Sequence, residues 1–198
     1  MTSPITKQPT YEQTPSQSEC DGTEWMIKPS ASGGTPPGLE YLGLIDTLII
    51  KQKKEWLEIF SGFETQNRYV IRNKVGQQVY YAFEESDAFE RQCCKGNRGF
   101  TIHIVDNFNK EVMLIDRPPA WCSGCCCCAD PGSFCSQTLT VEAPPGNLIG
   151  SIEQRRTWCA PGFYLKDMNG EAQLMIGTDD CCLPACFDSY FNVYFFDS

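Results

Sequence analysis

Histidine and positive charge are scarce in this sequence. Its 198 residues include one histidine, His103, and 16 Lys and Arg stand against 25 Asp and Glu, which gives a net charge of −9 at pH 7. A single histidine excludes sites that need two from one chain, such as a metalloprotease helix. The acidic balance argues against nucleic acid as the main partner, because phosphate binding needs clustered Lys and Arg. No nucleophile–base pair or phosphate-binding loop is recognisable, so an enzyme is the least favoured interpretation.

Long hydrophobic runs are also lacking. Residues 1–38 are polar and proline-rich, and they hold no apolar core of the kind that a signal peptide needs. The best apolar stretch, residues 42–50, has nine residues and contains Asp46. A transmembrane helix needs about 20 apolar residues. The sequence therefore predicts a cytosolic N-terminus and no membrane-spanning helix within these residues.

Cysteine, in contrast, is abundant, with 13 residues. In a chain without a signal peptide we expect thiols rather than structural disulfides, and an odd number cannot pair completely within one molecule. Six of the cysteines lie between residues 122 and 135, and smaller clusters lie at residues 93–94 and 181–186. Adjacent cysteines point in different directions, so a run of four suits a single tetrahedral metal site poorly.

The composition divides the chain into an arm and one domain. Residues 1–35 are rich in Ser, Thr, Gln and Pro and have no apolar periodicity, which predicts a disordered arm. A Pro-Pro-Gly breaker follows, and residues 36–198 have the length of one ordinary domain. Proline-rich pieces of the arm could bind SH3 or WW domains, although their loose spacing favours a plain linker.

The domain reads as a series of β-hairpins. Three pairs of alternating apolar segments are joined by turns at residues 73–76, 106–109 and 167–170, and a fourth pair is joined at 143–146. Three of these turns begin with Asn or Asp, whose side chain can bond the backbone two residues on, and Gly in several of them supplies a positive φ. Residues 39–59 fit either a short helix or strands, and residues 190–196 fit a last strand with an unpaired edge. We predict an all-β antiparallel meander of about ten strands.

Several segments resemble the phospholipid scramblase family. They are residues 36–42 (PPGLEYL), residues 62–69 (GFETQNRY), Arg117-Pro118, the cysteine run at 125–128, and residues 142–146 (EAPPG) with Ile149-Gly150. The likeness covers roughly residues 36–196. It implies a tubby-like fold, in which twelve antiparallel strands form a β-barrel around a central apolar C-terminal helix. It also implies a palmitoylated protein on the cytosolic face of the plasma membrane that lets phospholipids cross the bilayer in both directions, stimulated by calcium and without ATP.

The resemblance also predicts what this sequence does not contain. The family's closing strands, acidic calcium segment and apolar helix would follow Phe196, so we expect a shortened isoform or fragment with about ten of the twelve strands and no metal site before Ser198. A single-pass topology is expected only for a chain that includes that helix. The alternative function is a palmitoylated, membrane-associated adaptor or signalling module without transport activity.

The candidate palmitoylation residues are Cys125, Cys126, Cys127 and Cys128. A thioester needs accessible thiols near a membrane, and several together provide the two anchors that stable attachment requires. A zinc site is an alternative, in which Cys122 and the first cysteine of the run join Cys182 and Cys186, but the separation from residue 125 to residue 182 is long for a zinc ribbon. A buried or redox-sensitive thiol cluster is the third interpretation.

The remaining charged groups favour ordinary structural roles. The acids at positions 179, 180 and 188 lack EF-hand spacing, so we expect a solvated loop. We interpret His103 as a packed or surface strand residue and the acids at 84, 85 and 87 as a polar hairpin end. The lysines at 51, 53 and 54 form a small basic patch with weak preference for anionic lipid.

Strand alternation also identifies candidate inward-facing residues, which are Ile102, Ile104, Leu114, Leu165 and Leu174. In the fold that the family implies, a central helix would cover them. Without that helix we expect the isolated chain to fold poorly or aggregate, because exposed apolar surface costs roughly 25 cal/mol per Å².

Overall fold

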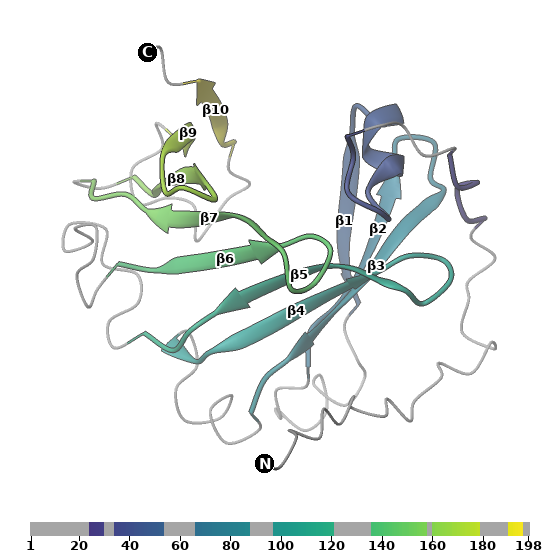
Figure 1. The fold of residues 1–198 in the computed structure, drawn as a ribbon, viewed down its shortest axis with the longest axis horizontal. Coiled ribbons are helices and arrows are strands. Elements are labelled where there is room, and N and C mark those ends of the chain that lie inside the picture. The colour runs from purple at the N-terminus through teal and green to yellow at the C-terminus, as the bar shows by residue number, and fades with distance from the viewer. Residues whose placement is uncertain are drawn as a thin grey trace, which may run out of the picture.

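The residues that the structure describes form ten β-strands and one short 3-10 helix (Figure 1). The structure is a computed structural model, and the described residues are 24–29, 34–53, 66–87, 97–120, 136–157, 160–178 and 190–195. The elements are η1 (Glu40–Leu44), β1 (Leu48–Lys53), β2 (Arg68–Asn73), β3 (Gln78–Glu85), β4 (Phe100–Val105), β5 (Glu111–Arg117), β6 (Thr138–Glu142), β7 (Leu148–Gln154), β8 (Gly162–Asp167), β9 (Ala172–Gly177) and β10 (Asn192–Phe195).

All ten strands belong to one antiparallel sheet in which each strand pairs with the next strand in the sequence. Within the described ranges β1 and β10 are the two edges, and the sheet stays open. Figure 1 shows the strand direction turning from the upright β1 and β2 to the nearly level β4–β7, which reflects the twist of β-sheets. The all-β prediction and its ten antiparallel strands are confirmed, and the curved open sheet is consistent with an incomplete tubby-like barrel.

The segment for which the sequence allowed a helix or strands contains both. Glu40–Leu44 forms η1, and β1 begins four residues later at Leu48. Residues 54–60, where the sequence also favoured a strand, lie outside the described residues.

Residues 24–26 lie beside β3. The Met26 N–H donates to the Gln78 carbonyl at 2.9 Å, and the Gln78 N–H donates to the Glu24 carbonyl at 3.0 Å, with Trp25 bridging to Gln78 in parallel. These residues fall within the stretch 1–35, most of which lies outside the described residues. The predicted division into an arm and a domain stays a prediction.

The β2–β3 turn shows how the hairpins are built. Asn73 begins the turn, and its Oδ1 accepts hydrogen bonds from the backbone N–H of Val75 at 3.2 Å and of Gln77 at 2.9 Å. Gly76 donates its N–H to the Asn73 carbonyl at 3.0 Å and has φ +90°, a conformation that glycine adopts without steric cost. The side chain that the sequence predicted to organise this turn therefore does so.

The same turn recurs in the other hairpins. Asp106 Oδ1 accepts from the N–H of Phe108 and Lys110 at 2.9 and 3.0 Å, and Asp167 Oδ1 accepts from Asn169 and Glu171, both at 2.9 Å. In the β6–β7 turn Ala143 takes the first position, and Glu142 Oε2 accepts from the Gly146 N–H at 2.7 Å. The positive φ falls on Asn109 in the β4–β5 turn and on glycine in the others. Because consecutive strands are antiparallel, all four turns lie at the same end of the strands.

Each of these hairpins also contains a β-bulge at an equivalent place. The extra residue follows the first residue of the turn by six positions (73 to 79, 106 to 112, 143 to 149 and 167 to 173). In the first two hairpins it is Val79 and Val112, which have no exposed surface. A bulge re-aims a side chain, and here it adds one valine from each hairpin to the core.

The core lies over β2–β5, beneath η1 and the segment that leads into it. Its buried members are Leu39, Tyr41, Ile71, Val79, Tyr80, Ala82, Val112 and Ala143. The Tyr41 and Tyr80 rings meet edge to face at 5.6 Å, and the Tyr80 hydroxyl donates to the Gly38 carbonyl at 2.8 Å. Burial raises the pKa of Tyr80, so its hydroxyl stays a donor.

Candidate functional site

The strand register separates the sheet into an apolar face and a polar face. We call apolar the face that carries the core residues Tyr80, Ala82, Ile104 and Met113. Beyond the core this face continues through the pair Ile115–Val141 and then through two rows that cross the C-terminal strands. The longer row is Leu139, Ile152, Leu165, Leu174 and Phe195, and beside it runs Gln154, Phe163, Ile176 and Val193.

The opposite face of the same strands is more polar. Its cross-strand rows are Thr140, Ser151 and Lys166, and Thr138, Glu153, Tyr164, Met175 and Tyr194. Lys166 forms an ion pair with Glu153 across this face. The alternation matches an antiparallel sheet with one face against an apolar partner and one face toward water.

The apolar face is buried in the N-terminal half of the sheet, mostly half-buried on β6–β9 and exposed on the edge strand β10. Tyr80 and Ala82 are each 3% exposed beneath the core, whereas Val193 is 56% and Phe195 82% exposed. Side chains of β8 and β9 on this face are only half-buried. Apolar surface that stays in water costs roughly 25 cal/mol per Å², so this part of the sheet is suited to bind an apolar helix or acyl chains.

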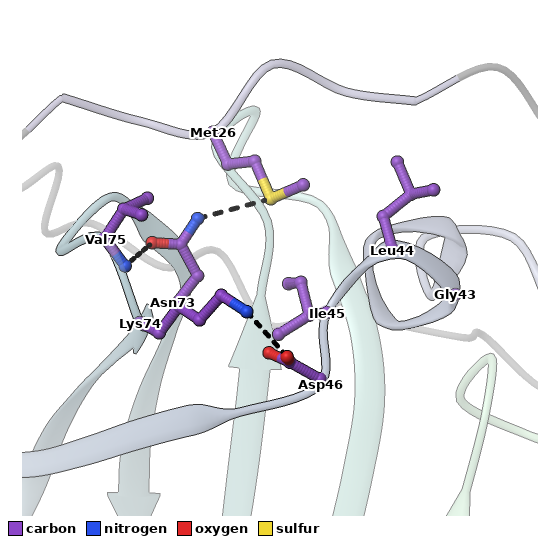
Figure 2. Close-up of a pocket in the computed structure, with 8 residues that line it drawn as sticks. All are labelled: Met26, Gly43, Leu44, Ile45, Asp46, Asn73, Lys74 and Val75. Atoms are coloured by element: carbon purple, nitrogen blue, oxygen red, sulfur yellow. Dashed lines mark hydrogen bonds and ion pairs between the residues drawn. The ribbon is translucent and has the colours of Figure 1, made fainter.

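A groove of about 600 Å³ lies at the other end of the core, between η1 and the β2–β3 turn (Figure 2). Figure 2 shows Leu44 and Val75 on its two sides with Met26 between them. Lys74 Nζ and Asp46 Oδ2 are 2.6 Å apart and join the two walls. This lysine lowers the pKa of the Asp46 carboxyl, so the ion pair forms at neutral pH.

A polar cluster lies at the end of the core that is remote from the β2–β3 turn. Glu84 is buried and accepts hydrogen bonds from both Arg98 Nη2, at 2.8 and 3.1 Å, and Ser86 Oγ, at 2.7 Å, as well as from the Asn67 amide. Burial alone would raise the pKa of the Glu84 carboxyl, but these hydrogen bonds and the charge of Arg98 outweigh it and lower the pKa. The guanidinium of Arg117 lies 4.7 Å from the Phe100 ring in the same cluster. The donors to Glu84 come from the segments that flank β2, β3 and β4, and they are Asn67, Ser86 and Arg98, so the cluster is an internal structural ion pair.

His103 is a packed strand residue on the polar face. Its ring stacks on Phe83 at 5.0 Å, and its two nitrogens contact Glu111 Oε1 at 2.6 Å and Glu85 Oε2 at 3.0 Å. Glu84, Glu85 and Asp87 lie at the end of β3, as the sequence predicted, and Glu85 and Asp87 are exposed there, but strand alternation sends Glu84 to the opposite face, where it is buried. Glu84 is buried because Arg98 reaches it from the segment before β4.

Comparison with known proteins gives the family. A sequence profile of the Scramblase family matches residues 26–198. The chain is 41% identical over 174 residues to human phospholipid scramblase 1, covering 87% of this chain and 52% of the relative. It is 40% identical over 171 residues to bovine phospholipid scramblase 2, covering 85% of this chain and 56% of the relative. No solved structure matches.

The chain belongs to the phospholipid scramblase family. The resemblance predicted from the short motifs is thereby confirmed. The scramblase chain described here spans about half the length of the curated relatives it matches.

Only some of the site residues predicted for this scramblase chain lie within the described residues. The cysteine run at 125–128 and the acids at 179, 180 and 188 lie outside the described residues, so the acylation and zinc interpretations stay predictions. Among the described residues no group of three or more His, Cys, Asp and Glu side chains could hold a metal ion. Of the lysine patch, Lys51 and Lys53 are exposed on β1. No helix in the described ranges is long and apolar enough to span a bilayer.

Four of the five predicted inward residues share the apolar face, and one does not. Ile102, Ile104, Leu165 and Leu174 lie on it, but Leu114 opposes His103 and Glu142 on the polar face. The prediction for Leu114 is wrong because the bulge at Val112 shifts the alternation of β5 by one residue. The continuous row from Leu139 to Phe195 was not predicted from the sequence. The repeated spacing between turn and bulge could have predicted it, because that spacing sets the register in which these residues pair.

Proposed function

We propose that this chain acts in the bidirectional, ATP-independent movement of phospholipids between the leaflets of a membrane, as a lipid translocator rather than an enzyme. Membership of the scramblase family supports the substrate class. The single structural observation that carries the proposal is the continuous apolar face of β6–β10, which is mostly half-buried on β6–β9 and exposed on β10.

The dimensions of that face suit a lipid or a lipid-facing helix. The row from Leu139 to Phe195 crosses five strands. Four strand spacings amount to about 19 Å, which is comparable to one leaflet of a bilayer core about 30 Å thick. An acyl chain or apolar helix laid along this row would cover side chains that water otherwise contacts.

Lipid movement is measured with the full chain reconstituted in vesicles that carry a fluorescent phospholipid, with an added reductant that bleaches only the outer leaflet. We expect bleaching to exceed one half in vesicles with the chain. Leu165→Asp with Leu174→Asp, a cross-strand pair on the apolar face, should slow the movement by about tenfold or more. Tyr164→Asp with Met175→Asp is the matched control, because it is the neighbouring cross-strand pair of the same strands on the polar face.

A chain that binds vesicles but moves no lipid would contradict this proposal and leave the adaptor function. Equal loss in both double variants would also contradict it, because the effect would then come from the strands and not from their apolar face.

Calcium stimulation is a separate part of the proposal. The family resemblance supports it, and the described residues contain no candidate metal cluster. We expect lipid movement by the longer relatives to rise with calcium, and we expect calorimetry on this chain to find no saturable calcium site at micromolar concentration. A saturable site in this chain would contradict this part of the proposal.

Palmitoylation is proposed to hold the chain on the cytosolic face of the plasma membrane. The supporting observation is the run of four adjacent cysteines. Cells fed an alkyne palmitate should label the chain, and replacing Cys125, Cys126, Cys127 and Cys128 with Ala should remove the label. Labelling that survives both this substitution and hydroxylamine would contradict thioester acylation at these residues.

A further inference from the structure

Four large apolar side chains protrude together at the turn end of the core. They are Ile27, Leu44, Val75 and Phe108, between 67 and 84% exposed, and we call them the tip patch. Each comes from a different segment: the residues beside β3, the end of η1, the β2–β3 turn and the β4–β5 turn. Scattered single apolar residues are normal on a surface, but four gathered at one end form a patch that needs a partner.

Contacts between these segments hold them side by side. The groove in Figure 2 is lined by Leu44, Val75 and Met26, the neighbour of Ile27. The β4–β5 turn joins them because the Tyr41 hydroxyl donates to Asn107 Oδ1 at 3.1 Å. Lys28 Nζ lies 6.0 Å from the centre of the Phe108 ring.

The turns fix Val75 and Phe108 in the outward position. Asn73 Oδ1 binds the Val75 N–H itself at 3.2 Å, and Asp106 Oδ1 binds the Phe108 N–H itself at 2.9 Å. Turn tips of this type ordinarily carry Asn, Asp, Ser or Gly, so valine and phenylalanine are not required by the turn. A backbone held by its own side-chain hydrogen bonds cannot fold these residues back onto the core.

Basic side chains surround the tip patch in a chain whose net charge is −9. Lys28, Lys74 and Lys110 each adjoin or lie near one of its members. Among the described residues three carboxylates interact with these lysines: Asp106, 3.9 Å from Lys28, and Glu40, which interacts electrostatically with Lys28 and Lys110, are buried, and Asp46, at Lys74, is exposed. The outer layer of the patch therefore combines apolar tips with positive charge, which suits a surface of anionic lipid.

The shape of the patch favours a fluid partner over a folded one. The β2–β3 and β4–β5 turns are two strand positions apart, so their tips are separated by about 10 Å. A folded protein would need a pocket for each tip at matching spacing, whereas lipid headgroups and acyl chains can surround each tip independently. A second copy of this chain offers one groove at this end, between Leu44 and Val75, for four protruding side chains.

We propose that the tip patch docks this chain on an anionic membrane surface, with Ile27, Leu44, Val75 and Phe108 inserted among the lipid headgroups and the neighbouring lysines against phosphates. This deepens the proposed function, on which it rests for the presence of a membrane. It does not depend on acylation, because the predicted thiols follow Arg117, at the opposite end of the strands from these turns. A cysteine near the middle of the 20-residue connection from Arg117 to Thr138 can reach about 35 Å from the strand ends, because both ends are held by paired strands, so an acyl anchor there does not by itself fix the orientation of the sheet.

The test is sedimentation of the full, unacylated chain with vesicles of phosphatidylcholine that contain phosphatidylserine. We expect binding, and Ile27→Ser with Leu44→Ser, Val75→Ser and Phe108→Ser should lower the partition coefficient by about tenfold or more. Lys28→Gln, Lys74→Gln and Lys110→Gln should each weaken binding by about fivefold and remove the preference over pure phosphatidylcholine vesicles. Met168→Ser should change little: Met168 is 66% exposed on the β8–β9 turn, where Asp167 and Glu171 flank it and Lys166 is ion-paired with Glu153.

A second readout follows insertion directly and does not depend on loss of binding. Phe108→Trp should add a fluorescence component that brominated lipids quench, and Met168→Trp should add one that they do not. The tip-patch proposal is overturned if the four-residue variant binds vesicles as tightly as the parent, or if the tryptophan at 108 escapes quenching. It is overturned in favour of a second copy if the parent does not bind vesicles and the four-residue variant abolishes a dimer seen by sedimentation.

These outcomes are separable from those of the scrambling assay. If lipid moves but the four-residue variant binds undiminished, only the docking surface is wrong. If the tip patch binds vesicles but no lipid moves, only the scrambling function is wrong.

Discussion

Gly38 lies where the chain enters the core, and both its backbone and its lack of a side chain are required there. Its φ is +97°, and a Cβ built on it would stand 2.1 Å from Cγ1 of Val112, which is fully buried. The Tyr80 hydroxyl also binds the Gly38 carbonyl, so the backbone cannot move away freely. The methyl group of an alanine at position 38 would strain the backbone, because φ is positive there, and would collide with the side chain of Val112.

We predict that Gly38→Ala lowers the free energy of unfolding by about 3 kcal/mol, from backbone strain together with overpacking. Gly76→Ala is the matched control, because Gly76 has φ +90° but open space around its Cβ position. It should cost only the strain, about 1 kcal/mol. Chemical denaturation of the two variants measures the difference, and equal losses would show that Val112 adapts to the added methyl group.

Glu84 makes the stability of the protein depend on pH. Hydrogen bonds from Ser86, Arg98 and Asn67 lower the pKa of its carboxyl in the folded state. The stabilisation from the ionised form is therefore present above the ordinary glutamate pKa of about 4.3 and is lost as the pH falls through the lower pKa of the folded state. Removing the charge would leave Arg98 without its carboxylate partner.

We predict that Glu84→Gln destabilises the protein by about 3 kcal/mol at pH 7, as expected for breaking a buried ion pair. The deficit relative to the parent should shrink as the pH falls below about 4. Denaturation midpoints across this range measure it, with Glu171→Gln, at an exposed turn residue, as the control. A deficit that stays constant with pH would show that the loss comes from packing and not from the charge of Glu84.

The four hairpins share the same turn and the same bulge position, but the bulge residue is buried to different extents. The bulge residue is fully buried as Val112 in the β4–β5 hairpin, and it is 38% exposed as Ile149 in the β6–β7 hairpin. The same backbone position thus supports the core in one half of the sheet and faces solvent in the other.

We predict that Val112→Ala lowers the free energy of unfolding by about 2 kcal/mol, whereas Ile149→Ala, which removes more atoms, costs less than about 1 kcal/mol. Thermal or urea denaturation of the two variants decides between burial and side-chain size as the cause. A larger loss at Ile149 would mean that a partner covers this residue in the folded protein.

Local signals in the sequence were sufficient to predict the hairpins, but they were not sufficient to predict which face of the sheet each side chain occupies. Asn73, Asp106 and Asp167 marked the turns because a short polar side chain can bind the backbone within its own segment. The face of a strand depends on bulges, which are set by pairing with a neighbour, and this is why Leu114 was placed wrongly. The burial of Glu84 and His103 depends on partners 14 and 18 residues away, beyond the reach of a local pattern.

Across the whole molecule, the two halves of the sheet differ in how far their apolar face is buried. The core of β2–β5 has apolar cover from Leu39 and from Tyr41 of η1, while the row from Leu139 to Phe195 lies outside this core and is half-buried on β6–β9 and exposed on β10. A domain is stable by only about 5 to 15 kcal/mol, so an uncovered apolar wall can remove much of that margin. The C-terminal strands should therefore depend on a ligand that covers their apolar face.

We predict that the isolated chain melts at a low temperature or aggregates, and that a synthetic apolar helix or lipid vesicles raise its thermal midpoint, because a ligand that binds only the folded state stabilises it. The gain should come from the apolar face: Leu165→Ser with Leu174→Ser should abolish it, and Tyr164→Ser with Met175→Ser, the adjacent pair on the polar face, should preserve it. Calorimetry with and without vesicles measures both effects. A sharp cooperative melt of the lone chain above about 60 °C would contradict the prediction, since such a midpoint lies in the upper mesophile range and would mean that the sheet needs no cover.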